Sequence, residues 1–194
     1  MEAEKEKNLL KTEPYITTVS GKKFFIRHPE RSEICIEDIA HALSNVCRFA
    51  GHTKHFYSVA QHAILVSDLC GMTEIERFRG LNHDNSEAYI CDLPSPYKNL
   101  TELGAHYKKF EDAVTDSINK AIGIDTCMTE TVKWADRTAL LVEKRQLLPK
   151  EVVWSWENDW IDKYQLPEVE IVPMTPEESE QKFLENFYSL SKLL

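Results

Sequence analysis

The sequence contains no long hydrophobic run and no linker rich in glycine, serine or proline. A helix that spans a bilayer needs about 18 or more residues with few or no charges, and no stretch of this chain approaches that length. The first residues, MEAEKEKNLLK, lack the apolar core of a secretion signal. We therefore expect a cytoplasmic protein that does not contact a membrane.

Cysteine is sparse and scattered along the chain. There are five cysteines, and no two of them form a C-x-x-C pair. This number and spacing indicate neither a disulfide framework nor a cysteine zinc site. We expect all five to be reduced, and most of them to be packing residues.

Positively charged residues are fewer than negatively charged ones. The chain has 23 lysines and arginines against 32 aspartates and glutamates, a net charge of -9. Binding along a nucleic-acid backbone needs a basic face, so this balance argues against a nucleic-acid partner. A small anionic ligand is compatible with it only where positive charge is gathered locally. A hydrophobic fraction of 42% in 194 residues is enough for a real core, which excludes a disordered chain.

The periodicity predicts a mostly α fold with one small β-hairpin. Two β-prone runs around Gly21 predict the hairpin at 15–26, and residues 1–14 are expected to form a flexible tail. Helices are expected at 37–48, 55–70, 73–91, 101–122, 128–148 and 176–193. Residues 150–175 are expected to form an irregular flap, and 15–194 a single domain.

Three predicted helices carry metal-ligating groups on their apolar faces. His62 has Val59 three positions before it and Val66 four after it. His83 and Asp84 follow on the next predicted helix, and Asp136 lies on an apolar face of a third. Each has a simpler interpretation, as a core histidine bonded to a carbonyl or a polar residue in a solvated groove.

Taken together, the two imidazoles and two carboxylates suit a divalent cation. Such a set is typical of Zn, Mn, Fe or Co, and it leaves coordination positions for water and substrate. A water bound to such a cation loses a proton near neutral pH, which makes it a nucleophile for a phosphoester.

The pattern His62, His83-Asp84, Asp136 resembles that of the HD-domain phosphohydrolases. The stretch HDNSEAYICDLPSPYK, from His83 to Lys98, is similar to the HD-x-SE…DLP-x-P-x-K segment of the bacterial and phage 5′-deoxynucleotidase-like branch. Arg48-Phe49 and SVAQH, ending at His62, also fit that branch. The resemblance covers roughly residues 34–145 and implies an HD-domain helical bundle.

The resemblance also assigns roles to individual residues. It implies that His62, His83, Asp84 and Asp136 bind one tightly held metal ion: Mn, Co, Zn or Fe rather than Mg. It implies that Glu87 and Asp92 are the catalytic carboxylates. Helical spacing would place Glu87 on the same face as His83 and Asp84, although a surface glutamate or a turn-initiating aspartate would look the same in sequence.

Three further residues are expected to contact substrate. Arg48 and Lys98 are candidates for the phosphate, because an acidic protein must supply local positive charge where an anion docks. In the family, a tryptophan typically follows the arginine and packs against the sugar. Here it is Phe49, so strict selection of deoxyribose is not implied.

The sequence thus leaves three functions open. The first is hydrolysis of nucleoside 5′-monophosphates to nucleoside and phosphate. The second is release of triphosphate from a deoxynucleoside triphosphate such as dATP, and the third is a non-catalytic module that binds nucleotide or metal. A small-molecule nucleotide is the expected partner, and relatives in this branch are often oligomers, which implies a homo-oligomer here.

Overall fold

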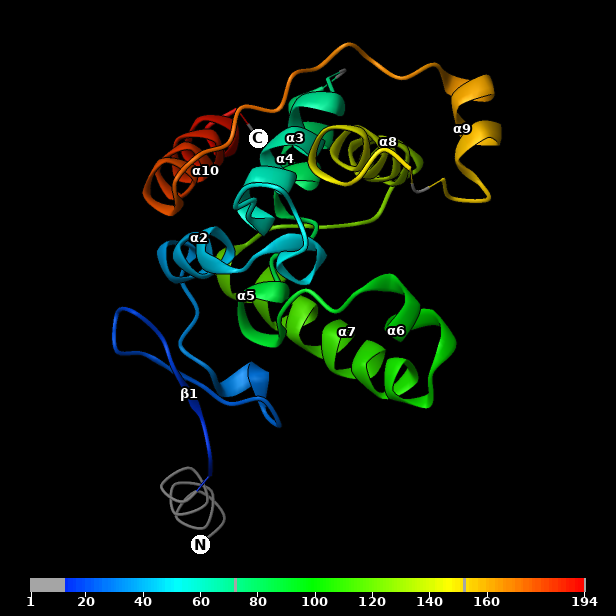
Figure 1. The fold of residues 1–194 in the computed structure, drawn as a ribbon. Coiled ribbons are helices and arrows are strands. Elements are labelled where there is room, and N and C mark those ends of the chain that lie inside the picture. Colours follow the sequence, from blue (N-terminus) through cyan, green and yellow to red (C-terminus); the bar gives the residue numbers. More distant parts are fainter. Residues whose placement is uncertain (1–12, 72, 152, 194) are drawn as a thin grey trace, which may run out of the picture.

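A computed structural model describes residues 13–71, 73–151 and 153–193 of the chain. The fold is mostly helical with a small antiparallel hairpin near the N-terminus, as the sequence predicts (Figure 1). The elements are β1 (Ile16–Thr17), β2 (Lys23–Phe24), the short 3-10 helices η1 (Pro29–Arg31) and η2 (Arg48–Gly51), and the helices α2 (Ile36–Asn45), α3 (Val59–Leu69), α4 (Glu74–Asn82), α5 (Glu87–Ile90), α6 (Ser95–Leu100), α7 (Glu102–Ile122), α8 (Glu130–Leu147), α9 (Glu157–Tyr164) and α10 (Pro176–Ser191). In the part of the chain that the structure describes, no helix has the length and apolarity to cross a bilayer.

The hairpin lies where the sequence placed it. Ile16 pairs with Phe24, and Gly21 adopts a positive φ of 84° in the turn, a conformation that glycine reaches without a steric cost. Phe24 is fully buried and stacks on Tyr89 of α5, with ring centroids 3.8 Å apart. The hairpin therefore covers one end of the helical core. Residues 1–12 of the predicted tail lie outside the described residues.

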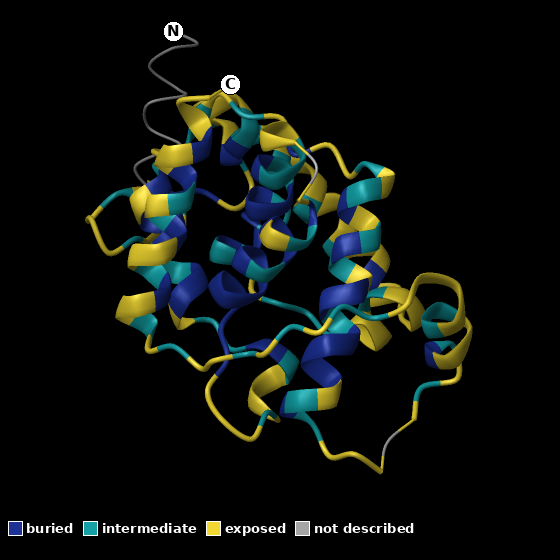
Figure 2. Cartoon of the chain, turned by 90° about the horizontal axis from the view of Figure 1, so that it is seen from above, coloured by how far each residue is buried: buried dark blue, intermediate teal, exposed yellow. Residues whose placement is uncertain are grey.

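The main core forms where α2, α3, α4 and α10 pack together. Leu43, Val59, Leu81 and Phe183, one from each of these helices, are fully buried. A second apolar cluster joins α3 to α8, and the buried faces of these helices point inward in Figure 2. This arrangement brings α3, α4 and α8 side by side.

Helix α3 begins later than predicted. The helix expected at 55–70 starts at Val59, because Ser58 and Gln61 form a capping box. The Ser58 hydroxyl accepts from the Gln61 amide, and the Gln61 side chain accepts from the Ser58 amide. The helix expected at 37–48 ends at Asn45, since Val46 is extended and accepts a hydrogen bond from the Val59 amide.

The prediction of one helix over 73–91 is wrong. The helix α4 ends at Asn82, four residues form turns, and α5 begins at Glu87. The interruption contains short polar side chains that compete with the helix for backbone hydrogen bonds. Asn82 donates to the Phe78 carbonyl, and Asn85 donates to the Asn82 side chain. The argument that placed Glu87 on the same helix face as His83 therefore fails.

Two helices were not predicted from the sequence. Ser95 and Pro96 occupy the first turn of α6, where proline is favoured because its missing N–H would be unbonded there. Within the predicted flap at 150–175, α9 occupies Glu157–Tyr164, and an extended segment then runs to α10 (Figure 1). That segment is tied to α8, because Gln146 donates to the Val169 carbonyl at 2.7 Å.

Candidate metal centre

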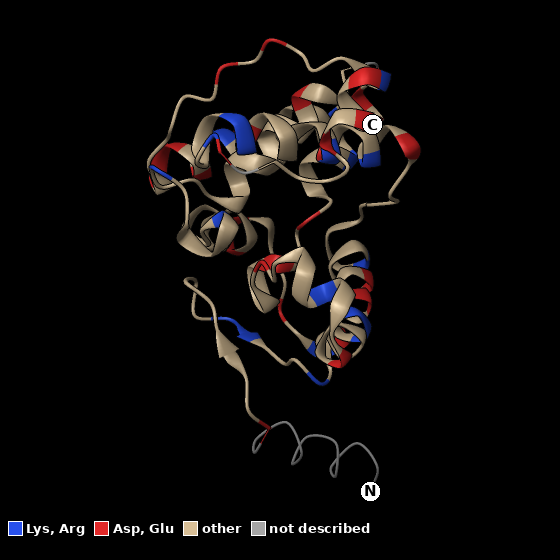
Figure 3. Ribbon diagram, turned by 45° about the vertical axis from the view of Figure 1, so that its right-hand side comes forward, with Lys and Arg blue, Asp and Glu red and all other residues tan. Residues whose placement is uncertain are grey.

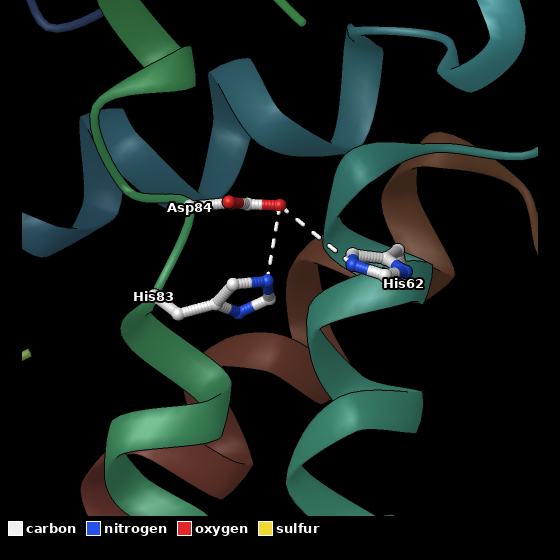
Figure 4. A group of neighbouring side chains, drawn as sticks. All are labelled: His62, His83 and Asp84. Carbon is white, nitrogen blue, oxygen red and sulfur yellow. Dashed lines mark ion pairs between the residues drawn. The ribbon is translucent and has the colours of Figure 1, made fainter. Parts of the chain in front are cut away.

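Three of the predicted ligands lie together at the contact between α3 and α4. His62 lies on α3, while His83 and Asp84 directly follow α4 (Figure 4). An oxygen of Asp84 lies 3.2 Å from His83 Nε2 and 3.7 Å from His62 Nε2. The ligand atoms of the three residues all lie within 4.8 Å of one another, so this group could hold a metal ion.

The fourth predicted ligand, Asp136, approaches from α8. Its Oδ1 atom is 3.2 Å from His62 Nε2 and 4.0 Å from His83 Nε2. Val66 of α3 packs in one cluster with Val132 and Ala135 of α8. Because Asp136 directly follows Ala135, this packing positions Asp136 near α3. The structure thus brings the four predicted residues to one place.

The hydrogen bonds of the two histidines fix which ring nitrogen faces the centre. His83 Nδ1 lies 2.7 Å from the Gly80 carbonyl, and His62 Nδ1 lies 2.6 Å from Glu143 Oε1. Carbonyl and carboxylate oxygens accept, so both Nδ1 atoms must carry the proton. Both Nε2 atoms are buried and have no hydrogen-bond partner among the described residues. In neutral rings their lone pairs would face carboxylate oxygens, so the arrangement needs a positive charge there, either a proton on the ring or a bound cation.

The electrostatics of the site agree with that requirement. Burial lowers the pKa of His83, but the carboxylate of Asp84 outweighs it, so that the pKa rises to about 9. Burial likewise raises the pKa of Asp136, yet the close approach and charge of His62 outweigh it and hold the pKa below its usual range. The negative potential at this point attracts cations, and a divalent ion fits the donor set of two imidazoles and two carboxylates.

Glu143 belongs to the centre, although it was not predicted from the sequence. It is fully buried on α8 and holds His62 from behind. In the sequence it stands in the charged run EKR, which looks like a solvated helix face. The available signal was its spacing, since Glu143 follows Asp136 by two helical turns and so shares its face.

Arg48 lies beside the carboxylates rather than on the surface. Its guanidinium contacts Glu143 at 3.3 Å and Asp84 at 3.9 Å, and the residue is 9% exposed. Burial would lower the pKa of Arg48, but Glu143, Asp92 and Asp84 raise it, so the group stays charged. The predicted phosphate ligand is therefore adjacent to the candidate metal ligands.

Glu87 and Lys98 form a pair next to the centre. Lys98 Nζ lies 3.4 Å from Glu87 Oε1 and 3.0 Å from Glu111 Oε1. Glu87 is 3% exposed, and its second oxygen has no hydrogen-bond partner among the described residues. Burial, followed by the charges of Asp84 and Asp92, raises the pKa of Glu87 well above its usual value. The role predicted for Lys98 in substrate binding stays a prediction, because both its ion pairs are with protein carboxylates.

Backbone strain adjoins two of the predicted residues. Phe49 and Ala50, directly after Arg48, have φ values of 53° and 50°. Cys91, directly before Asp92, has φ 66° and ψ 161°, a region that side chains other than glycine rarely enter. Such conformations persist only where the surrounding structure imposes them, and they cluster at functional sites.

A pocket of about 1350 Å³ opens beside Asp136, the one predicted metal ligand among its lining residues. Four predicted residues line it: Arg48, Phe49, Asp92 and Asp136. The opposite wall comes from the predicted flap and includes Trp154, Trp156 and Trp160. The concentration of tryptophan at 154–160 is the sequence signal for this wall, since it indicates a flap that could complete the pocket.

The fold and the site define a helical protein with a buried histidine–aspartate centre that could hold a metal ion. The chain is 38% identical over 182 residues to the uncharacterized protein YfdR of Escherichia coli. The matched region covers 92% of this chain and 97% of that protein. It is also 32% identical over 134 residues to an uncharacterized protein of Rhodobacter capsulatus, across 66% of this chain and 67% of the relative. The chain belongs to the YfdR family. No family model matches the sequence.

Proposed function

We propose that this protein is a divalent-metal-dependent nucleotide phosphohydrolase of the HD-domain type. It cleaves the 5′-phosphoester of nucleoside or deoxynucleoside monophosphates to nucleoside and phosphate. The observation that carries the proposal is the pair of buried Nε2 atoms of His62 and His83, which face the oxygens of Asp84 and Asp136 without a hydrogen-bond partner among the described residues. The resemblance of residues 83–98 to the HD…K segment supports it.

His62, His83, Asp84 and Asp136 would hold the cation. When bound, a divalent cation lowers the pKa of a coordinated water and polarises a phosphoryl oxygen. Arg48 is placed beside these ligands, where its planar guanidinium would bind two phosphoryl oxygens and neutralise their charge.

Glu87 and Asp92 are the groups that would handle protons. The unbonded oxygen of Glu87 is buried near Asp84, and Asp92 lines the pocket at the strained turn after Cys91. Burial and the neighbouring carboxylates raise the pKa of both groups, which suits a carboxyl that donates a proton to the leaving 5′-oxygen. Lys98 orients Glu87 through their ion pair.

The size of the pocket favours a second candidate. Small-molecule pockets usually enclose about 300–1000 Å³. The volume here, about 1350 Å³, is larger than a nucleoside monophosphate needs and would admit a triphosphate. Release of intact triphosphate from a deoxynucleoside triphosphate is therefore the alternative reaction of the same site.

A phosphate-release assay tests the proposal. Metal-stripped protein is supplied with Mn²⁺, Co²⁺ or Zn²⁺ and with each nucleoside monophosphate, deoxynucleoside monophosphate and deoxynucleoside triphosphate. We expect orthophosphate from monophosphates, with activity lost in Asp84→Ala and Glu87→Gln. Intact triphosphate would establish the alternative reaction. Absence of turnover with every metal, while metal still binds, would overturn the hydrolase and leave a binding module.

A further inference from the structure

The four tryptophans of this chain are gathered in one place. Trp134 of α8 and the three at 154, 156 and 160 all line the pocket beside Asp136. Trp154 and Trp156 stack on each other, with ring centroids 5.6 Å apart. Such a concave surface of large flat side chains is suited to a planar ring, since aromatic rings combine extensive apolar contact with preferred stacking geometries.

Arg137 lies against this wall in an arrangement that the metal centre does not explain. Its guanidinium carbon lies 4.2 Å from the centroid of the Trp156 ring and 4.8 Å from that of Trp160. Its side chain makes no ion pair or hydrogen bond with any residue that the structure describes. Arg137 is an exposed residue at the pocket lining, so its donors face solvent and are available to a ligand that occupies the pocket.

The wall is held in position by α8, the helix that carries Asp136. Trp160 Nε1 donates to Thr138 Oγ1 at 3.4 Å. Lys144 forms an ion pair with Glu157 at the start of α9, and both side chains are less than 10% exposed. Helix α8 therefore positions both Asp136 and the tryptophan wall. A ligand in the pocket can contact Asp136 and the wall at the same time.

We propose that Arg137 and the tryptophan wall form the base subsite of the nucleotide. This inference rests on the proposed function for the phosphate end of the ligand. Arg137 offers parallel donors to an edge with two adjacent acceptors, and guanine presents such an edge with O6 and N7. Adenine presents an amino group in place of O6, so a donor of the base would face a donor of Arg137. The subsite therefore prefers a guanine nucleotide to an adenine nucleotide.

Tryptophan fluorescence tests the subsite without any need for catalysis. Because every tryptophan of the chain lines the pocket, a ring bound there changes the whole intrinsic signal. The titration uses deoxyguanosine, deoxyadenosine and orthophosphate separately, with a chelator present. We expect saturable quenching by deoxyguanosine, weaker binding of deoxyadenosine, and no effect of orthophosphate.

Two variants of Arg137 and one control complete the experiment. Arg137→Ala is expected to weaken deoxyguanosine binding by about tenfold or more, the discrimination typical of a bidentate pair. Arg137→Lys keeps a cation near the rings but not the two parallel donors, so it should bind both nucleosides with similar affinity. Arg145→Ala, an exposed position of the same helix outside the pocket, should bind as the parent does. Circular dichroism establishes that the variants are folded.

The outcomes separate this inference from the proposed function. Lack of saturable quenching by deoxyguanosine, or equal affinity in Arg137→Ala and Arg145→Ala, would overturn the base subsite even if phosphate is released. Equal affinity of the parent for deoxyguanosine and deoxyadenosine would overturn the guanine preference. Conversely, deoxyguanosine binding that depends on Arg137, without release of phosphate from any nucleotide, would support the subsite and reject the hydrolase.

Discussion

At the scale of single residues, Glu143 controls the state of His62. Its carboxylate accepts the Nδ1 proton at 2.6 Å and so keeps the Nε2 lone pair directed at Asp84 and Asp136. It also lies 3.3 Å from Arg48, which links the candidate metal ligand to the candidate phosphate ligand. Because the buried carboxylate of Glu143 contacts both side chains, it couples the orientation of His62 to the charge of Arg48.

We predict that Glu143→Gln weakens metal binding. The neutral amide is a poorer acceptor for the His62 proton, and loss of such a partner typically lowers metal affinity about 10- to 100-fold. Competition with a chromophoric chelator for Mn²⁺ or Zn²⁺ measures the effect. Glu151→Gln, an exposed position, is the matched control and should bind as the parent does. Equal metal affinity in the two variants would show that Glu143 does not contribute to metal binding.

The residue scale is also where sequence reasoning was most informative. Spacing on apolar faces selected His62 and Asp136 before any contact was known, and the structure places them 3.2 Å apart. Glu143 was missed because it stands in the charged stretch Glu143-Lys144-Arg145, where a buried group and a solvated one look alike. Only the fold determines which residue of such a stretch turns inward.

At the scale of elements, one carboxylate fastens the hairpin to the helices. Asp38 of α2 accepts from the Ser20 amide at 3.0 Å and from the Ser20 hydroxyl at 2.7 Å. Burial would raise the pKa of Asp38, but these hydrogen bonds outweigh it and hold the pKa below the usual value. The contribution of this contact to stability is therefore present at neutral pH, and it is lost as the pH falls through the lowered pKa.

We predict that Asp38→Asn destabilises the protein at pH 7 by about 1.5–3 kcal/mol, the range for a hydrogen bond to a charged group. Since protonation removes the same charge from the parent, the difference between parent and variant should shrink below about pH 4. Urea unfolding at several pH values measures it. A difference that stays constant down to acid pH would contradict this account.

Elements also mark the limit of prediction from sequence. The regular hydrophobic periods of α7, α8 and α10 were predicted to within two residues at each end. The break between α4 and α5 was missed, although Asn82–Ser86 contains no apolar residue and its asparagines make the local side-chain hydrogen bonds that compete with a helix. Helix α6 was not predicted, although Pro96 lies in its first turn, a position that proline favours.

At the scale of the whole molecule, charge is distributed rather than gathered. Along α7, Lys residues are intermixed with Asp and Glu (Figure 3), and Lys108 pairs with Asp112 at 2.7 Å. These exposed pairs contribute little to stability, roughly 0.2–1 kcal/mol each. The buried charges are different, because Arg48, Glu143, Asp84 and Glu87 meet at a single point.

We predict that metal binding stabilises the entire fold. At a concentration 100 times the dissociation constant, a ligand of the native state adds about 2.7 kcal/mol, or roughly 5–10 °C in the unfolding midpoint of a protein of this size. Thermal unfolding with Mn²⁺ or Zn²⁺, compared with a chelator, measures the shift. The shift should vanish in Asp84→Asn and persist in Asp116→Asn, an exposed position on α7. Equal shifts in both variants would place the metal elsewhere.

The candidate centre joins distant parts of the chain, since His62 and Asp136 are separated by four helices in the sequence. A cation shared between them would act as a reversible cross-link that closes a long loop in the native state, where the ligands come together, and it would dissociate from the unfolded chain. The order in which the chain is synthesised then becomes relevant. The first three ligands precede α8 in the chain, so during synthesis the cross-link can close only after α8 has been made.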